Sequence, residues 1–150
     1  MDSSKIKCVL VVANRTASTQ RLLDEISRRA ERESTRFTLL LPDAPNRKAA
    51  DWTLEVAIPL LRRAARGPVD HLVGGPDPFI AVQDAVRGHD FDEIIISTLP
   101  RRTSKWLRRD LIHRVESLGL PVTAVIPRRA KVGLDDPDIA RGIGLSGGIP

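Results

Sequence analysis

The sequence predicts an α/β fold in which helices cover both faces of a doubly wound, five-stranded parallel sheet. Short continuous apolar runs alternate along the chain with segments whose apolar residues recur at helical spacing, in the pattern βαβαβαβαβ. Continuous apolar strands are typical of a sheet that is covered on both faces. With 150 residues and 41% hydrophobic content, the chain is long enough to bury one core.

The first half of the chain predicts two strands, each followed by a helix. The strands are expected at residues 8–13 and 37–41, and Pro42 stops the second. Asp51 is the expected cap of the second helix, in which Pro59 predicts a kink or a break. The candidate caps of the first helix are Thr16, Ser18 and Thr19.

The second half predicts three strands and two helices. The segment "VDHLV", residues 69–73, is weakly apolar and is therefore expected at an edge of the sheet. Asp77 and Pro78 are typical of a helix start, and Ser104 is the expected start of an arginine-rich helix. The other strands are expected at residues 94–96 and 122–126. Residues 1–127 form the predicted domain, and the Gly/Pro-rich residues 128–150 form a predicted tail.

Composition narrows the classes of function. The 24 Lys and Arg residues exceed the 19 Asp and Glu residues, and a net charge of +5 permits anion or nucleic-acid binding. Aromatic residues make up only 3% of the chain, whereas proteins that bind single-stranded nucleic acid stack bases on aromatic side chains. The single cysteine, Cys8, lies in an apolar run and is expected to be buried. No signal peptide or membrane span is evident, so we expect a cytoplasmic protein.

Residues 6–127 resemble the universal stress protein family. The resemblance rests on "CVLVVANRT" at the first strand, "GGPDPFIAVQDA" at the third strand–helix junction, and "DEIIISTLPRRTSKWLRRDLIHRV" with "LPVTAVIP" at the end of the domain. It implies the strand order 3-2-1-4-5 and a homodimer that pairs through the last strand. The apolar segment "PVTAVI", with no charged residue, suits such an interface.

The residues by which ATP-binding members of that family hold the nucleotide are missing. Those members carry an aspartate at the end of the first strand, where this sequence has Ala13 or Asn14. They also carry a Gly-x-x-Gly motif after the fourth strand, with a Gly-Ser/Thr pair further on. Here Ser97 and Pro100 stand at the first two glycines, and the pair falls within residues 109–111. Because Pro100 has no N–H for a phosphate, no cofactor is implied, and ATP or AMP would have to be held in another way.

A site is still expected where the strand order reverses, between the first and fourth strands. A small anion or a nucleotide phosphate can bind there to hydroxyls, arginines and the N–H groups of a helix. Each residue also has a structural alternative: Ser104 as a plain helix cap, Thr98 as a cap of the strand end, Arg15 as a surface arginine. The candidate ligand-binding residues are Asn14, Arg15, Thr16, Ser97, Thr98, Arg101, Arg102 and Ser104.

A basic surface on the predicted last helix is the second candidate site. Lys105, Arg109 and His113 are spaced to share one helix face. Cations near a helix N-terminus oppose its dipole, which favours a negatively charged partner such as nucleic acid or an acidic protein. The alternative is a solvated face. The residues of this surface are Lys105, Arg108, Arg109 and Arg114.

Catalysis has little support in the sequence. His71, His89 and His113 lie in different elements without metal-ligand spacing, and no serine lies in a nucleophile motif. We therefore predict no catalytic and no metal-binding residues. The leading hypothesis is a non-catalytic universal stress protein-like regulatory domain that binds a small anion or nucleotide phosphate in the crevice. The alternatives are a basic-helix module for nucleic acid or an acidic protein, and a small hydrolase of adenylate-like substrates.

Overall fold

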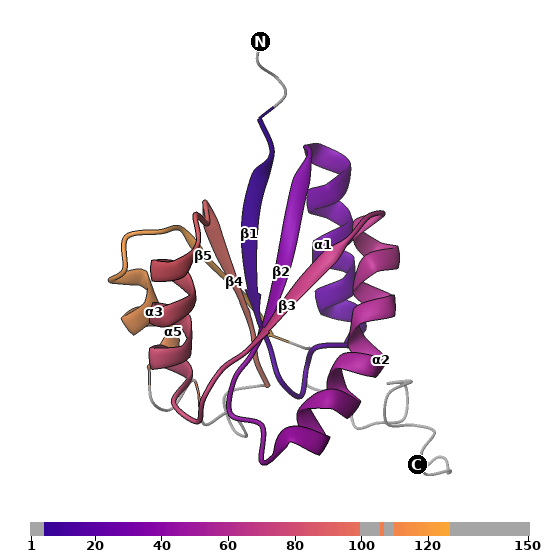
Figure 1. Cartoon of the computed structure of the whole chain (residues 1–150). Coiled ribbons are helices and arrows are strands. Elements are labelled where there is room, and N and C mark those ends of the chain that lie inside the picture. Colours follow the sequence, from indigo (N-terminus) through magenta and orange to yellow (C-terminus); the bar gives the residue numbers. More distant parts are fainter. Residues whose placement is uncertain (1–4, 100–105, 107–109, 127–150) are drawn as a thin grey trace, which may run out of the picture.

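Strands and helices alternate along the chain as the sequence predicts (Figure 1). The computed structural model describes residues 5–99, 106 and 110–126. The strands are β1 (Lys7–Val12), β2 (Thr35–Leu41), β3 (Val69–Val73), β4 (Glu93–Ser97) and β5 (Val122–Val125). The helices are α1 (Gln20–Arg32), α2 (Arg47–Ala65), α3 (Pro78–Gly88) and α5 (Leu111–Glu116). None of the helices in the described part is long and apolar enough to cross a membrane.

The strands form one parallel sheet in the order β3-β2-β1-β4-β5. This confirms the predicted fold class, the predicted strand order and the edge position of β3. Val12 of β1 pairs with Leu40 of β2 and with Ile96 of β4, so these three strands end together. β5 forms the other edge, and the homodimer expected there stays a prediction.

Two apolar layers hold the helices to the sheet. α1 and α2 cover one face, and α3 and α5 cover the other (Figure 1). Because side chains of a strand alternate between faces, Val9 and Val11 pack under α1 and α2, whereas Leu10 and Val12 pack under α3 and α5. β4 is buried along its whole length, which explains its apolar sequence. Cys8, expected to be buried, is half-buried at the start of β1.

The start of α2 differs from the prediction. Asn46 caps the helix instead of Asp51, and its side-chain oxygen accepts a hydrogen bond from the Ala49 N–H at 2.8 Å. The added first turn contains lysine and alanine, which are good helix formers. α2 also continues through Pro59 to Ala65, so of the predicted kink or break the break does not occur. At α1 the cap position is held by Thr19, whose side chain makes no capping bond.

The arginine-rich segment after β4 is not one uninterrupted helix. Trp106 is helical, but Asp110 has a left-handed backbone with φ of 58°, and α5 begins after it. A left-handed residue breaks the register of an α-helix. The predicted helix is therefore interrupted before Leu111. Lys105 and Arg109 lie outside the described residues, so the face predicted for them with His113 stays a prediction. The buried side chains of α5 are Leu111 and Val115.

Candidate functional site

Two predicted site residues meet where the strand order reverses. Thr16 lies in the loop that leaves β1, and Ser97 is the last residue of the neighbouring β4. Their hydroxyl oxygens lie 2.6 Å apart and share a hydrogen bond. Both residues are buried, with Ser97 fully enclosed. Topology therefore brings the two hydroxyls together as expected, and each has the other as its partner.

The other described residues of this junction differ in what they offer a ligand. The Asn14 side chain donates to the Pro42 carbonyl at 2.6 Å, which joins the exits of β1 and β2. Thr98 is buried, and its N–H donates to the Val125 carbonyl at 3.0 Å. Arg15 is exposed and forms no ion pair with the described residues. Among the described residues of the junction, Arg15 is thus the charged group that faces solvent.

Most of the remaining candidates lie outside the described residues. They are Arg101, Arg102, Ser104, Lys105, Arg108 and Arg109. Arg114 is described and lies on α5, where its guanidinium carbon is 4.4 Å from the centre of the Phe79 ring. This cation–π contact turns Arg114 toward α3, and the side chain reaches a pocket.

Substitutions in the Thr16–Ser97 pair test whether its hydrogen bond stabilises the fold. Ser97→Ala should lower the free energy of unfolding by about 1–2 kcal/mol, because it leaves the buried Thr16 hydroxyl without a partner. The double variant Thr16→Val, Ser97→Ala should recover most of that loss, since both polar groups are gone. Urea unfolding of the three proteins measures the difference. Equal losses in the single and double variants would contradict the structural role.

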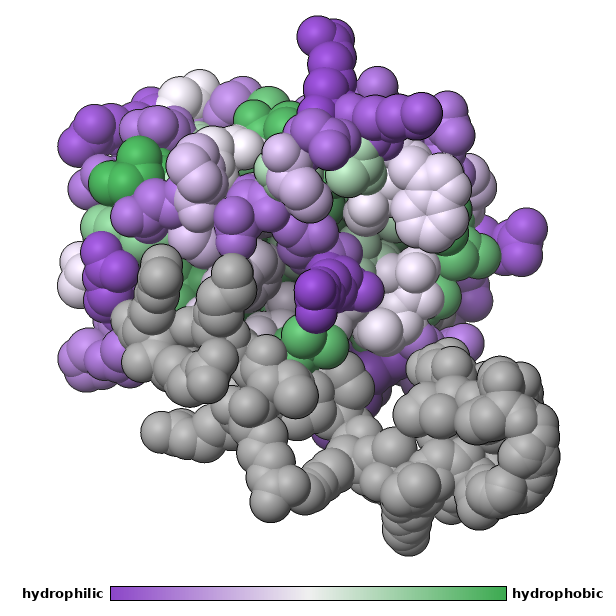
Figure 2. Space-filling view, turned by 90° about the horizontal axis from the view of Figure 1, so that it is seen from below, coloured by the Kyte–Doolittle hydropathy of each residue, from purple (hydrophilic) through white to green (hydrophobic). Residues whose placement is uncertain are grey.

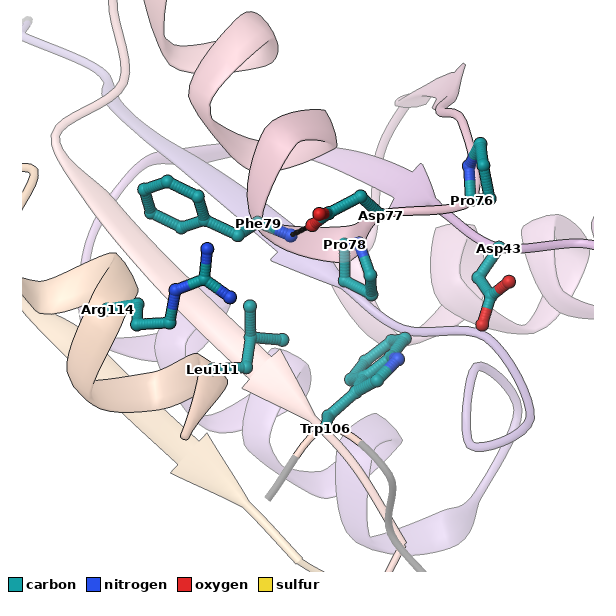
Figure 3. A pocket seen from close by; sticks show the side chains of 8 residues that line it. All are labelled: Asp43, Pro76, Asp77, Pro78, Phe79, Trp106, Leu111 and Arg114. Atoms are coloured by element: carbon teal, nitrogen blue, oxygen red, sulfur yellow. Dashed lines mark hydrogen bonds between the residues drawn. The ribbon is translucent and has the colours of Figure 1, made fainter. Parts of the chain in front are cut away.

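A pocket of about 190 Å³ opens at the end of the sheet formed by the carboxyl ends of the strands (Figure 3). Figure 2 looks onto this end of the molecule and shows a mainly hydrophilic surface with small separate apolar areas. In Figure 3, Arg114 and Phe79 lie at one end of the pocket and Asp43 at the other, with Pro78 and Leu111 between them. The lining residues are Asp43, Pro76, Asp77, Pro78, Phe79, Trp106, Leu111 and Arg114.

Local backbone chemistry fixes the walls of this pocket. Asp77 caps α3, and its side-chain oxygen accepts from the N–H groups of Phe79 at 2.9 Å and Ile80 at 3.3 Å. Asp43 follows β2 with a left-handed φ of 59°, and its N–H donates to the Gly75 carbonyl at 2.8 Å. Asp is one of the few residue types that adopt this conformation readily. The loops after β2 and β3 are therefore held together beside the start of α3.

Asp110 marks a feature that the sequence alone did not reveal. It falls within residues 109–111, where the resemblance places the glycine of the Gly-Ser/Thr pair, and its φ of 58° is in the region that favours glycine. A left-handed residue thus directly precedes α5, and Leu111 and Arg114 of this helix both line the pocket.

A cluster of ion pairs lies at the other end of the strands, where β1 and β4 begin. Arg29 of α1 donates to Glu93 of β4, to Glu25 at 2.8 Å and to the Thr123 hydroxyl of β5 at 3.0 Å. Lys7 of β1 pairs with Glu93 at 3.0 Å. Burial raises the pKa of Glu93, but hydrogen bonds from Lys7 and Arg29 and their charges outweigh it and hold that pKa below its usual value. This ion-pair cluster joins α1 to β1, β4 and β5.

Sequence reasoning missed most of the pocket, because Arg114 is the one lining residue among the predicted site residues. Asp77 and Pro78 were expected only as a helix start. Trp106 packs against the core on the α3 and α5 face, and it also lines the pocket. One feature of the sequence could have indicated Asp43 as a site residue. It directly follows Pro42 at the end of a strand, and ligands bind at strand ends in α/β sheets. Nothing in the sequence places it opposite Arg114.

Solved structures share this fold. No family model matches the sequence, and no curated protein matches it. A universal stress protein from Archaeoglobus fulgidus in complex with dAMP aligns with a TM-score of 0.57 and 16% identity, over 81% of this chain and 98% of that chain. A second structure of universal stress protein from this organism aligns with a TM-score of 0.55 and 16% identity, over 79% and 93% of the two chains. The protein therefore has the universal stress protein fold.

Proposed function

We propose that this protein is a non-catalytic, universal stress protein-like regulatory domain that binds a small anion or the phosphate of a nucleotide. The position of the pocket carries the proposal. It opens at the carboxyl ends of the parallel strands, the edge at which open α/β sheets bind ligands. A protein of the same fold has been solved in complex with dAMP, which supports a nucleotide as the ligand class.

The lining of the pocket suits a ligand with an anionic end. Arg114 supplies a planar cation, and its stacking on Phe79 at 4.4 Å holds the guanidinium in place. At the other end Asp43 supplies a hydrogen-bond acceptor, while Trp106 and Pro78 supply apolar contact (Figure 3). A phosphate near Arg114 and a donor group near Asp43 would satisfy both ends.

The size of the pocket limits how much of a ligand it encloses. Its volume of about 190 Å³ lies below the roughly 300–1,000 Å³ of sites that bury a drug-sized molecule. We therefore propose that one group of the ligand, a phosphate or a single ring, enters the pocket and that the rest lies on the surface. This mode differs from a glycine loop that wraps a whole triphosphate.

The distribution of titrating groups supports a role in binding rather than in catalysis. Strongly perturbed pKa values often mark catalytic acids and bases. In the described part of the chain, the groups with shifted pKa are Lys7, Glu25, Arg29 and Glu93. All four belong to the ion-pair cluster where β1 and β4 begin, at the end of the strands away from the pocket. There they form ion pairs with one another.

Thermal unfolding with ligands tests the proposal. The full chain is heated with ATP, AMP, cyclic AMP or inorganic phosphate, each with and without magnesium. A ligand that binds only the folded state adds about 2.7 kcal/mol at a hundred times its dissociation constant, so at least one of these should raise Tm. Arg114→Ala should abolish that increase, because it removes the cation from the pocket.

Two further arginine variants locate the ligand. Arg87→Ala, on the exposed end of α3, removes the same charge away from the pocket and should leave the increase in Tm intact. If Arg15→Ala abolishes the increase and Arg114→Ala does not, the ligand lies in the crevice between β1 and β4 instead. If none of the four compounds changes Tm, the proposed function is wrong.

A further inference from the structure

Asp43 is a carboxylate that the fold holds at the pocket without a partner. The Asn14 side chain donates to the Pro42 carbonyl, and the Asp43 N–H donates to the Gly75 carbonyl at 2.8 Å. The peptide group between Pro42 and Asp43 is thus bonded through both its C=O and its N–H. The half-buried Asp43 carboxylate forms no hydrogen bond or ion pair with another described residue. It is therefore a preorganised acceptor for the donor groups of a ligand.

The two ends of the pocket suit different parts of one nucleotide. Arg114 stacks on Phe79 at one end and forms no ion pair within the described part of the chain, so it suits the phosphate. Trp106 lines the pocket on the side where Asp43 lies (Figure 3). Bases of every kind stack on aromatic rings, so Trp106 favours a base without selecting one. Selection among bases needs a polar group such as Asp43.

We propose that the ligand is a guanine nucleotide and that the Asp43 carboxylate binds its base. This inference rests on the proposed function, because it names the base of a nucleotide bound at the same pocket. An ionised carboxylate has two acceptor oxygens and no donor. Guanine presents two neighbouring donors, N1–H and the 2-amino group, which the two oxygens accept side by side. Asp77, the other acidic lining residue, already caps α3.

Adenine matches the same carboxylate less well. Its 6-amino group donates a hydrogen bond, but the neighbouring N1 is an acceptor, so the second carboxylate oxygen would face a lone pair. One hydrogen bond is then lost, and two acceptors are brought together. Cytosine likewise carries an amino donor beside a ring acceptor. The loss of one hydrogen bond to a charged group corresponds to a roughly 10- to 100-fold preference for guanine.

The shape of the pocket agrees with this assignment. Its volume of about 190 Å³ suits one ring, and the six-membered ring of guanine carries both donors. Pro78 and Leu111 lie between the two ends of the pocket and offer apolar contact to the ribose (Figure 3). The nucleotide thus extends from its base at Asp43 to its phosphate at Arg114.

Isothermal titration calorimetry of the full chain with GMP, IMP and AMP tests the inference. GMP should bind roughly 10- to 100-fold more tightly than AMP. IMP keeps N1–H but lacks the 2-amino group, so its affinity should lie between the two.

Asp43→Asn is the decisive variant. Asparagine tolerates the left-handed backbone at this position, where φ is 59°, and its amide offers one donor and one acceptor in place of two acceptors. The variant should lose the preference for GMP and bind AMP at least as tightly as the wild type does. Asp84→Asn is the matched control, since Asp84 is an exposed residue of α3 outside the pocket lining, and it should leave both affinities unchanged.

The outcomes separate this inference from the proposed function. A preference for GMP that disappears in Asp43→Asn and persists in Asp84→Asn supports the inference. AMP binding as tight as GMP binding overturns it and leaves the proposed function standing. A preference for GMP that persists in Asp43→Asn also overturns it, because another group then selects the base. If none of these nucleotides binds, the inference is wrong, and titration with inorganic phosphate decides whether the small-anion function remains.

Discussion

Replacing Arg29 with methionine is expected to lower the free energy of unfolding by about 3 kcal/mol. Arg29 is only 8% exposed, and it pairs with Glu93, Glu25 and the Thr123 hydroxyl. Methionine fills a similar volume but, among the described residues, leaves the buried Glu93 carboxylate with Lys7 as its one cationic partner. Urea unfolding at neutral pH measures the loss.

Two comparisons isolate the cause of that loss. Arg66→Met breaks the exposed pair with Glu31, at 3.2 Å, and should cost less than about 1 kcal/mol. The double variant Arg29→Met, Glu93→Leu should recover most of the loss, because the uncompensated buried charge is gone. If the double variant is no more stable than Arg29→Met, the loss comes from packing and the ion-pair explanation is wrong.

The effect of Arg29→Met should also depend on pH. For both Glu93 and Glu25, burial raises the pKa, but hydrogen bonds and charges from their cationic partners outweigh it and leave the pKa lowered. A carboxyl whose pKa is lowered by folding stabilises the protein above its unfolded pKa, and this contribution is lost as the pH falls through the folded value. The difference between wild type and variant should therefore shrink as the pH is lowered below about 4.5.

The second large effect is expected from Gly74→Ala, which should lower the free energy of unfolding by about 2 kcal/mol. A Cβ at Gly74 would lie 2.5 Å from the Ala81 Cβ of α3 and 3.4 Å from a Leu40 methyl group. Real Cβ atoms do not approach so closely, so α3 must move away from the sheet. Because α3 begins at the pocket wall, ligand-induced increases in Tm should fall together with stability.

The neighbouring glycine is a matched control. Gly75→Ala meets no heavy atom within 4 Å, and its φ is outside the positive range. It should therefore leave stability unchanged or raise it slightly, since alanine restricts the unfolded chain. Chemical unfolding of the two variants side by side measures the difference. Equal stability of Gly74→Ala and Gly75→Ala would show that α3 is not packed as tightly as the structure has it.

The sheet could be predicted from sequence because its signals are local and agree with one another. Each strand is an apolar run that ends at a polar or proline-containing loop, and Asp77 with Pro78 fixes the start of α3. The start of α2 could not be predicted, because Asn46 and Asp51 are both good helix caps. The residues between them can be the first turn of the helix or part of the preceding loop. The structure shows that Asn46 takes this role, with its side-chain oxygen bonded to the Ala49 N–H.

The candidate site was predictable only in part. Strand order alone places Thr16 beside Ser97, and the structure finds their hydroxyls 2.6 Å apart. The pocket depends instead on two left-handed residues, Asp43 and Asp110, that redirect the chain. Aspartate adopts this conformation often enough to be tolerated but too rarely to be predicted from sequence. The meeting of Asp43 and Arg114 in one pocket therefore required the structure.

The position of β5 has a consequence for local unfolding. β5 has four residues, pairs with β4 alone, and has Val125 as its one buried residue. An edge strand with so little buried surface is expected to open before the strands that are paired on both sides. Any assembly built on the edge of β5 would come apart before β1, β2 and β4 separate.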